Sequence, residues 1–474
     1  MAAQNAHVPS LNDEHKFEQE SDDQVSPVDR NDEEKAVPPE SEKPVEAAAG
    51  AEAQPNGPPK GPPAGPPGGP PPDGGLQAWL QVVGGWSLFF NTWGLLNTFG
   101  VYQTYYESGQ LFTASSSDIS WIGSVQSVMV LLVGAVAGPF FDRGYLRYLL
   151  IGGGFMVVFG HMMLSLTHSL WQVILAQGFC IGIGAGCLFV PAVALLPTYF
   201  SKKLGLAVGL AASGSSMGGI IYPIMFYRLV PEVGFPWAVR ILGFTVLATV
   251  LVPIIVMKQR VKPPKARAIL DTTAFTDWPF VTFVLASLIG FIGLYVGIFY
   301  ISFFGAATGF TNESLSFYLV PILNAGSVFG RTLPNALADK TGPLNVIAPG
   351  AFIVGLILLC NIAVHNAAGL IVTTILFGFF SGIFIALPPV MFVALTADRT
   401  KIGTRIGMGF AVVGLGTLAG GPGGGGILQR RGDDPATFDW TGTWTYGGVC
   451  MLAAGVILSA LRVYKAGFKL RVKV

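Results

Sequence analysis

The stretch from Ser314 to Gly342 reads SLSFYLVPILNAGSVFGRTLPNALADKTG, and the interpretation of the whole chain depends on it. It is apolar and long enough to cross a bilayer, yet Arg331 lies well inside its apolar run. Inserting an arginine into a membrane costs about 2.5 kcal/mol or more, so such a side chain usually faces a cavity or a partner. We therefore expect Arg331 to face a polar cavity inside a helical bundle. The alternative is that its side chain reaches the membrane interface.

The composition of the chain indicates a polytopic membrane protein. Of its 474 residues, 51% are hydrophobic and 12% are charged, whereas about 25% of the residues of a soluble domain are charged. The basic residues are scattered between apolar segments, so nucleic acid is not an expected partner. The four cysteines fall within apolar segments and form no cluster with histidine, which favours packing roles over a metal site. No cofactor is expected.

Twelve stretches of the chain are predicted membrane spans. A helix needs about 20 apolar residues to cross the hydrocarbon region of a bilayer. We therefore expect an all-α membrane protein whose partners include the lipid bilayer and a small-molecule solute. The spans lie near residues 77–104, 118–140, 147–167, 171–197, 204–228, 238–257, 278–304, 314–337, 344–364, 368–395, 405–427 and 441–463.

The spans divide the chain into five parts. Residues 1–72 are a tail, acidic at first and then rich in Pro and Gly, and this composition cannot bury enough apolar surface to fold, so we expect disorder. Residues 73–257 hold the first six spans, and residues 278–465 hold the second six. The basic linker 258–277 contains two consecutive prolines, which cannot continue a helix. Residues 466–474 form a short basic tail.

The basic residues predict the orientation of the spans. Lys and Arg recur in the loops that follow even-numbered spans and are almost absent from the loops that follow odd-numbered spans. The exception, Arg430-Arg431, is offset by nearby aspartates. Because cytoplasmic loops carry the excess of Lys and Arg, both termini are expected in the cytoplasm. The expected location is the plasma membrane.

A related turn follows the second span and the eighth span. Residues 138–144 and 336–342 each contain an aspartate, then a base, and end in glycine. An aspartate in such a turn can accept hydrogen bonds from a neighbouring helix N-terminus, and glycine permits the tight turn. A repeat at a distance of six spans indicates two six-helix pseudo-repeats. The residues assigned to this conformational motif are Asp142, Arg143, Asp339 and Lys340.

The turn with Asp142-Arg143-Gly144 resembles the signature of the major facilitator superfamily between spans two and three. More closely, the chain resembles the monocarboxylate porter family, particularly its fungal branch. Three features carry this resemblance: Pro72 to Gly75 with Trp79 after it, the run from Tyr199 to Gly214, and the position of Arg331 in span eight. The resemblance covers residues 73 to about 465. It implies the major facilitator fold and secondary transport by alternating access.

The chain departs from the monocarboxylate porter pattern at positions that matter for chemistry. The best-studied members of that family have an aspartate one turn before the arginine, where this chain has Ser327. They also have a lysine in span one, whereas residues 76–106 contain no Lys or Arg, and Leu76 and Gln77 replace aromatic residues. The usual residues for proton coupling are therefore missing. A lone guanidinium can still bind one carboxylate in a fork.

The candidate substrate-binding residues are polar residues within apolar spans. Asn324, Ser327 and Arg331 are spaced so that they share one face of span eight. The same criterion selects residues in spans one, two and seven. Asn91 and Gln126 have an equally plain alternative, which is a hydrogen bond to a neighbouring helix. The other candidates are Asn97, Tyr102 and Tyr295.

The glycine run GGPGGGG at residues 420–426 is a second unusual feature of the chain. A phosphate-binding loop is excluded because no GKS or GKT follows the run. We expect it to bend or loosen span eleven near its outer end.

These observations favour a secondary transporter for a small organic anion or a carboxylate-bearing metabolite. Export of a secondary metabolite is one such function, and the sequence does not separate export from uptake. Uptake of a nutrient monocarboxylate or a vitamin-like solute is the first alternative, and proton coupling of either process stays open. A non-transporting membrane sensor that signals through the tail is an alternative from another class. An enzyme is not expected, because no paired carboxylates, HExxH motif or nucleophile–base pattern is present.

Overall fold

The computed structural model describes residues 69–114, 116–260, 270–398, 401–432, 437–469 and 472–473. The chain divides into two compact units, Met1–Pro62 and Pro63–Val474, and every described residue belongs to the second unit. Most of the predicted tail 1–72 and the centre of the predicted linker 258–277 therefore lie outside the described residues. The predicted limits of the five parts of the chain stay predictions.

Predicted spans one to six each coincide with a helix or with a run of short helices. Span one is broken into three helices, and span four contains one π-helical stretch. Spans five and six form one long element, joined at Gly234, whose φ of 74° turns the chain without a loop. The helices are α1 (Leu76–Asn91), α2 (Trp93–Asn97), α3 (Phe99–Glu107), α4 (Ser116–Asp142), α5 (Leu146–Leu164), α6 (Leu170–Val173), the π-helix Ile174–Ile181, α7 (Gly182–Ala194), α8 (Leu196–Tyr199) and α9 (Leu204–Val256).

Predicted spans seven to twelve also coincide with helices, and span ten is divided in two. Short 3-10 helices at Thr272–Thr276, Asn361–Ala363 and Gln429–Arg431 lie between the long helices. The described residues contain no strand. The long helices are α10 (Trp278–Ala307), α11 (Glu313–Thr341), α12 (Leu344–Cys360), α13 (Ala367–Ala386), α14 (Pro388–Leu395), α15 (Ile402–Leu428) and α16 (Trp440–Ala466).

The described helices are consistent with a twelve-span membrane protein. Nine of them are long and apolar enough to cross a membrane, and α9 is one of the nine although it contains two predicted spans. The broken first span is too short in each of its pieces to be counted, and α11 is less apolar because it carries Asn324 and Arg331. The predicted fold class, an all-helical membrane bundle, is confirmed.

Three helices start with a side chain that caps their first turn. The N-cap residues Asn312 of α11, Asn366 of α13 and Asp439 of α16 each accept a hydrogen bond from the backbone N–H three residues later, at 2.7 to 2.9 Å. Asn and Asp at this position satisfy a backbone donor that the helix itself leaves free. The sequence therefore specifies where these three membrane helices begin.

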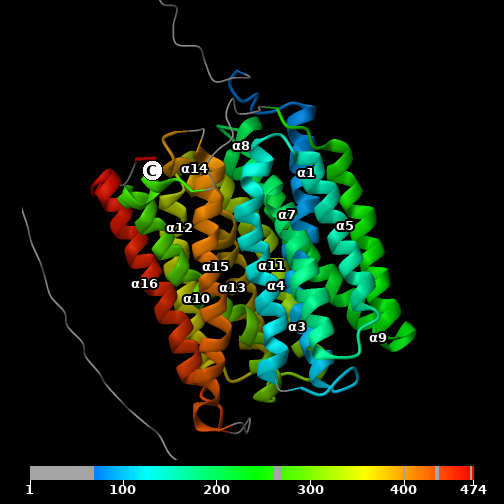
Figure 1. The fold of residues 1–474 in the computed structure, drawn as a ribbon. Coiled ribbons are helices and arrows are strands. Elements are labelled where there is room, and N and C mark those ends of the chain that lie inside the picture. Colours follow the sequence, from blue (N-terminus) through cyan, green and yellow to red (C-terminus); the bar gives the residue numbers. More distant parts are fainter. Residues whose placement is uncertain are drawn as a thin grey trace, which may run out of the picture. The chain divides into compact units, whose positions relative to one another are not determined.

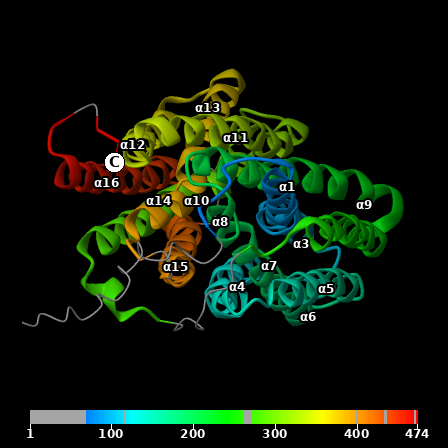
Figure 2. The same cartoon turned by 90° about the horizontal axis from the view of Figure 1, so that it is seen from above.

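The two sets of six spans repeat the same packing pattern. In the first set, α4 packs on α7, and α5 packs on both α7 and α9. In the second set, the helices at the corresponding positions pack in the same way: α11 on α13, and α12 on α13 and α16. Figure 2 shows α1, α4, α5 and α7 on one side and α10, α12, α13 and α16 on the other. This repetition agrees with the predicted pseudo-repeat.

Two pairs of helices make the most extensive contacts between the two sets, α9 with α11 and α4 with α15. We call the end of the bundle that carries the loops with Arg143, Lys203, Lys258, Lys340 and Lys401 the basic end; α8 and α14 lie at this end in Figure 1, and α3 lies toward the opposite end. The joined pairs are closely packed near the basic end.

Glycine makes this close packing possible. A Cβ atom at Gly209 of α9 would lie 2.2 Å from the backbone carbonyl oxygen of Arg331, and one at Gly407 of α15 would lie 3.2 Å from the Cα atom of Ala135. No larger residue fits at Gly209 without separating the helices. The bundle is therefore sealed at the basic end by contacts between backbones.

Candidate functional site

A threonine lies at each of the two breaks in the first span. Thr92 and Thr98 donate hydrogen bonds to the carbonyl groups four residues before them, at 2.9 and 3.0 Å. Such bonds compete with the helix ladder and bend helices. At Thr92 the backbone leaves the helical region, with φ −107° and ψ −80°. The short helix α2 that follows ends at Asn97, so the break sets the position of this side chain.

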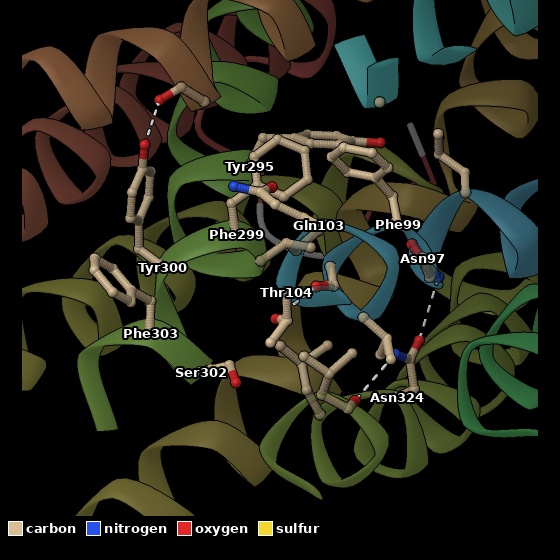
Figure 3. A pocket seen from close by; sticks show the side chains of 18 of the residues that line it. Asn97, Phe99, Gln103, Thr104, Tyr295, Phe299, Tyr300, Ser302, Phe303 and Asn324 are labelled. Atoms are coloured by element: carbon tan, nitrogen blue, oxygen red, sulfur yellow. Dashed lines mark hydrogen bonds between the residues drawn. The ribbon is translucent and has the colours of Figure 1, made fainter. Parts of the chain in front are cut away.

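Asn97 meets Asn324 from the other set of six spans. Asn97 Nδ2 lies 3.4 Å from Asn324 Oδ1, and Asn324 Nδ2 donates to the carbonyl group of Val320 at 3.0 Å. Figure 3 shows the two amides joined by this hydrogen bond. Gly219 of α9 leaves the space for Asn324, because a Cβ atom there would lie 2.8 Å from the amide. The amide pair therefore bridges the two sets.

Arg331 lies two helical turns from Asn324 on the same helix and is 3% exposed. Its Nε donates to Ser327 Oγ at 3.0 Å, and its Nη1 donates to the carbonyl group of Ala212 at 3.1 Å and to Ser215 Oγ. All of these acceptors are neutral. Within the part of the chain that the structure describes, no carboxylate forms an ion pair with Arg331.

A cavity of about 1660 Å³ lies between the two sets of helices. On the side of the basic end, the cavity is closed by residues of α1, α9, α11, α14 and α15. On the opposite side, it extends to the ends of the helices. Arg331, Ser327, Asn324, Asn97 and Tyr295 all line it. Its deepest lining residues are Phe89, Val208, Arg331, Pro389 and Phe410, and Ser108, Pro231, Ala306 and Gln429 lie near its mouth.

Arg331 is the only charged residue among the described residues that line the cavity. The rest of the lining is mostly aromatic and aliphatic, with a few amides and hydroxyls. A largely apolar pocket with few convergent polar groups is the usual form of a small-molecule site. The arrangement can bind one anionic group at the deep end and apolar surface above it.

Tyr295 forms part of an aromatic wall on α10. The rings of Phe291 and Tyr295 lie 6.1 Å apart between centroids and are nearly parallel, and the rings of Tyr295 and Phe299 lie 5.4 Å apart edge to face. Tyr300, on the neighbouring face, donates from its hydroxyl to the carbonyl group of Gly421 at 2.7 Å and points away from Tyr295 (Figure 3). The wall is thus held against α15.

Three of the predicted site residues do not line the cavity. Asn91 is fully buried and accepts hydrogen bonds from the hydroxyls of Tyr222 at 2.7 Å and Thr249 at 2.9 Å, which is the interhelical alternative. The ring of Tyr102 packs on the ring of Phe226, with 4.2 Å between the ring centroids. The hydroxyl of Tyr102 has no hydrogen-bond partner among the described residues. Gln126 is 2% exposed and lies within the first set of helices. The structure therefore does not bring these three together with Arg331.

Comparison with known proteins decides the family. The sequence profile of the Major Facilitator Superfamily matches residues 82–367. The chain belongs to the major facilitator superfamily. It is a multi-pass membrane transporter of small molecules and not an enzyme.

The chain is similar to other members of this superfamily, including two fungal proteins and one solved structure. The MFS-type transporter dbaD of Emericella nidulans is 63% identical over 386 residues, which is 81% of this chain and 86% of that protein. The aspyridones efflux protein apdF of the same organism is 39% identical over 362 residues, covering 76% of this chain and 74% of that protein. The human organic anion transporter MFSD10 shares the fold, with a TM-score of 0.63 at 13% identity, over 81% of this chain and 98% of that one.

The conformational motif of this transporter lies at the basic end. Asp339 Oδ1 accepts from the backbone N–H of Gly205 at 2.7 Å, and its Oδ2 accepts from Leu206 at 2.9 Å. A carboxylate near a helix N-terminus is favoured by the helix dipole. Asp339 therefore ties α11 of one set to the start of α9 of the other.

The first copy of the motif forms the same kind of turn. Asp142 ends α4 and is 3% exposed, and the guanidinium of Arg143 lies 6.0 Å from the ring of Phe140. Gly144 has a φ of 95° and Gly342 has a φ of 98°. Both glycines occupy the left-handed region that L side chains rarely adopt, which is why glycine ends both turns.

A second carboxylate reaches the start of α9. Asp73 Oδ1 accepts from the backbone N–H groups of Ser201 at 2.6 Å and Lys202 at 2.7 Å. Arg260 donates to the carbonyl group of Pro70 at 2.8 Å and to that of Thr198 at 3.0 Å. The residues just before span one are thereby attached to the loop before α9.

An ionic cluster joins the segment before α10 to the start of α15. Arg405 contacts Asp271 at 3.0 Å and Asp277 at 2.6 Å, and Lys401 contacts Asp271 at 2.9 Å. Burial alone would raise the pKa of the Asp271 carboxyl. Hydrogen bonds from Thr273, Lys401 and Arg405 outweigh burial and hold this pKa well below its ordinary range.

The sequence-based selection missed several cavity residues. Gln103 and Thr104 line the cavity three and four residues after Gly100, and Phe410 closes its deep end. Gly100 and Thr104 lie three and seven residues after Asn97, so helical spacing places them on the same face of span one as Asn97. Phe410 gave no such signal, because one more phenylalanine in an apolar span does not differ from its neighbours.

Proposed function

We propose that this transporter exports an acidic secondary metabolite across the plasma membrane, and that Arg331 binds the acidic group. The remaining substrate contacts are assigned to Asn97, Asn324, Ser327 and Tyr295. The acid would pair with a guanidinium that has no carboxylate partner among the described residues.

The observation that carries this proposal is that Arg331, at the deep end of an apolar cavity, is the single cation among the described lining residues. A buried charge without an opposite charge is costly, and an anionic ligand removes part of that cost. Arginine also offers a planar fork that matches a carboxylate. An anionic solute with a large apolar part is therefore the best chemical match.

The relatives support the export of a secondary metabolite. The chain is similar over most of its length to fungal transporters, and the names of two of them, the efflux proteins for aspyridones and for fujikurins, describe metabolite efflux. Within the superfamily, we propose that the chain belongs to the monocarboxylate porter family. The motifs near Asp73 and Tyr199 and the position of Arg331 support this proposal.

The orientation of the cycle follows from the charges. If the basic end faces the cytoplasm, as the excess of Lys and Arg in its loops favours, the cavity opens to the outside in this conformation. Both termini then lie in the cytoplasm. This conformation would be the one that releases an exported solute.

Uptake of a nutrient monocarboxylate is the second candidate function. A cavity of about 1660 Å³ exceeds the range of about 300–1,000 Å³ that is common for drug-sized ligands. A small acid would leave most of the cavity to water, which favours the larger solute of the first candidate. Proton coupling would need a titratable group elsewhere, because the described lining contains no acid and no histidine.

The proposal is tested by comparing the acidic metabolites in the medium of cells that express the wild-type chain or the Arg331→Gln variant. A hydrogen bond to a charged group contributes about 1.5–3 kcal/mol, so export should fall by about ten-fold or more in the variant. Arg331→Lys should restore it only in part, because lysine lacks the fork.

The control is Arg240→Gln on α9. Arg240 donates to Ser165 Oγ at 3.0 Å, stacks over Trp237 and does not line the cavity. This variant should export like the wild type. Normal export by Arg331→Gln, with equal amounts of protein in the membrane, would rule out the assignment of Arg331 to the solute path.

A further inference from the structure

The walls of the cavity also restrict the size and shape of its solute. We infer that Gly100 and Gly426 keep the outer part of the solute path open and that the path admits a bulky acid with several fused or linked aromatic rings. This inference rests on the proposed function, and it adds the class of solute and two specificity-determining residues.

The first step concerns the glycines that line the cavity. Five of the described lining residues are glycines, and three of them are covered by the rings of the protein itself. A Cβ atom at Gly123 would lie 2.3 Å from the ring of Phe99, and one at Gly421 would lie 3.0 Å from the ring of Phe299. One at Gly425 would lie 2.6 Å from the hydroxyl of Tyr300.

The other two lining glycines are not covered. At Gly100 of α3 and at Gly426 of α15, a Cβ atom would meet nothing within 4 Å, and both residues are exposed. Neither has a φ in the left-handed region, so the backbone does not require glycine at either position. The bare backbone at these two positions leaves space that belongs to the cavity.

The second step concerns what fits against such a backbone. Along the same walls, the rings of Phe99 and Phe299 already lie against the backbones of Gly123 and Gly421. Aromatic rings supply large contact areas against flat surfaces. The two open glycines offer the same kind of surface to a ring of the solute.

The third step concerns the ends of the path. Along α15, Gly426 lies sixteen residues from Phe410 at the deep end, and this corresponds to about 24 Å of helix. The two open glycines therefore act on a solute on its way between the mouth and Arg331. A side chain added at either position narrows that passage without disturbing the fold.

The experiment measures uptake into liposomes that contain the purified full chain. The probes are two permanent anions that differ in size, benzenesulfonate and pyrene-1-sulfonate. We expect the wild type to carry both. In Gly426→Trp and Gly100→Trp, uptake of pyrene-1-sulfonate should fall by about ten-fold or more, because the indole ring would occupy the space that the bare backbone leaves to a large solute. Uptake of benzenesulfonate should stay within about two-fold of the wild type.

The matched control is Gly152→Trp on α5. Gly152 is also exposed, and a Cβ atom there would also meet nothing within 4 Å, but this residue does not line the cavity. This variant should carry both sulfonates normally. Gly426→Ala should have an intermediate effect on the larger probe, which a general loss of folding would not produce.

Two results would overturn the inference. The first is a wild type that carries benzenesulfonate but not pyrene-1-sulfonate, or neither of them. The second is uptake of the larger probe at the wild-type rate by both tryptophan variants. If Arg331→Gln lost uptake of both probes in that second case, the proposed function would stand and only the role of the two glycines would fall.

Discussion

At the scale of single residues, the neutral surroundings of Arg331 decide the chemistry of the cavity. Ser327 accepts from Arg331 Nε at 3.0 Å, at the position where the resembled family has an aspartate. A serine there holds the guanidinium in place without neutralising it. The positive charge therefore stays available to a solute, and the cavity does not carry its own counter-ion in the described lining.

The first prediction at this scale concerns Ser327→Asp. The new carboxylate should pair with Arg331 and weaken binding of pyrene-1-sulfonate by about ten-fold or more at neutral pH. An ion pair with arginine lowers the pKa of a carboxyl group, so the weakened binding should persist when the pH is lowered from about 7 to about 4. The measurement is a binding titration at several pH values.

Ser327→Asn serves as the control, because it adds similar volume without charge. Its binding should not change with pH, and neither should that of the wild type, since both the sulfonate and arginine keep their charges over this range. A variant with aspartate that binds as tightly as the wild type at neutral pH would contradict this account of Arg331.

Helical spacing was enough to predict which residues of span eight share a face, and their role as substrate-binding residues stays a prediction. Asn324, Ser327 and Arg331 were placed on one face of span eight, and they line the cavity together. Asn91 and Gln126 were chosen by polarity alone, and polarity does not distinguish a cavity from a neighbouring helix. The partner hydroxyls of Asn91 come from Tyr222 and Thr249, which are distant in sequence.

At the scale of helices, the segment before α10 is held to α15 by charge. Asp271 is 8% exposed and contacts both Lys401 and Arg405. Its pKa is lowered in the folded protein because hydrogen bonds from Thr273, Lys401 and Arg405 outweigh the effect of burial, which acts in the opposite direction. The ionic contact therefore stabilises the folded protein at every pH at which the carboxyl group of Asp271 would also be ionised in the unfolded chain.

The prediction at this scale is a pH-dependent difference in melting temperature. A carboxyl with a lowered folded pKa contributes stability above its unfolded pKa of about 3.9, and this contribution is lost as the pH falls below that value. Asp271→Asn should therefore melt at a lower temperature than the wild type at neutral pH, and the difference should narrow below about pH 4. Thermal unfolding of the purified protein measures both.

The control for this prediction is Glu232→Gln, because Glu232 is exposed and lies outside the cluster. It should melt with the wild type across the whole range. A difference between Asp271→Asn and the wild type that stays constant down to acidic pH would mean that the cluster acts through packing and not through charge.

Helix positions could be predicted from apolar length, but their irregularities could not. Each predicted span has a helical counterpart. The break at Thr92 is a change in the backbone angles of one residue, and the turn at Gly234 depends on one residue with positive φ. Neither changes the apolar pattern from which the spans were predicted.

At the scale of the whole molecule, the closed basic end determines which side of the cavity is open. Asp339 contributes two hydrogen bonds to this closure, both to backbone N–H groups of the other set of helices. A hydrogen bond to a charged group contributes about 1.5–3 kcal/mol. Loss of this charge should therefore shift the conformational equilibrium measurably.

The prediction is that Asp339→Asn opens the basic end more often. It is measured by the rate of maleimide labelling in an Ala338→Cys background from which the four native cysteines are removed. Ala338 is 2% exposed in this conformation. We expect labelling to be several-fold faster in Asp339→Asn, whereas Glu232→Gln, at an exposed position outside the conformational motif, should leave the rate unchanged. Equal rates in all three proteins would show that Asp339 does not hold this end closed.

The twelve-span bundle was predictable because apolar length, the alternation of basic loops and the repeated turn all indicate it. The size of the cavity was not predictable. It depends on how far the helices diverge from the contacts at Gly209 and Gly407, and on whether each lining glycine is covered by a ring from another helix. Both are properties of packing between distant segments.

The guanidinium of Arg331, which has no carboxylate partner among the described residues, affects the step of the transport cycle in which the empty transporter changes conformation. Closing the mouth over an empty chamber would leave a bare positive charge shut away from water, whereas closing it over a bound acid encloses a neutral pair. We therefore expect the unloaded return to be the slow step. An anion supplied on the side to which the solute is released should then increase the turnover rate, because the transporter would carry it back in exchange.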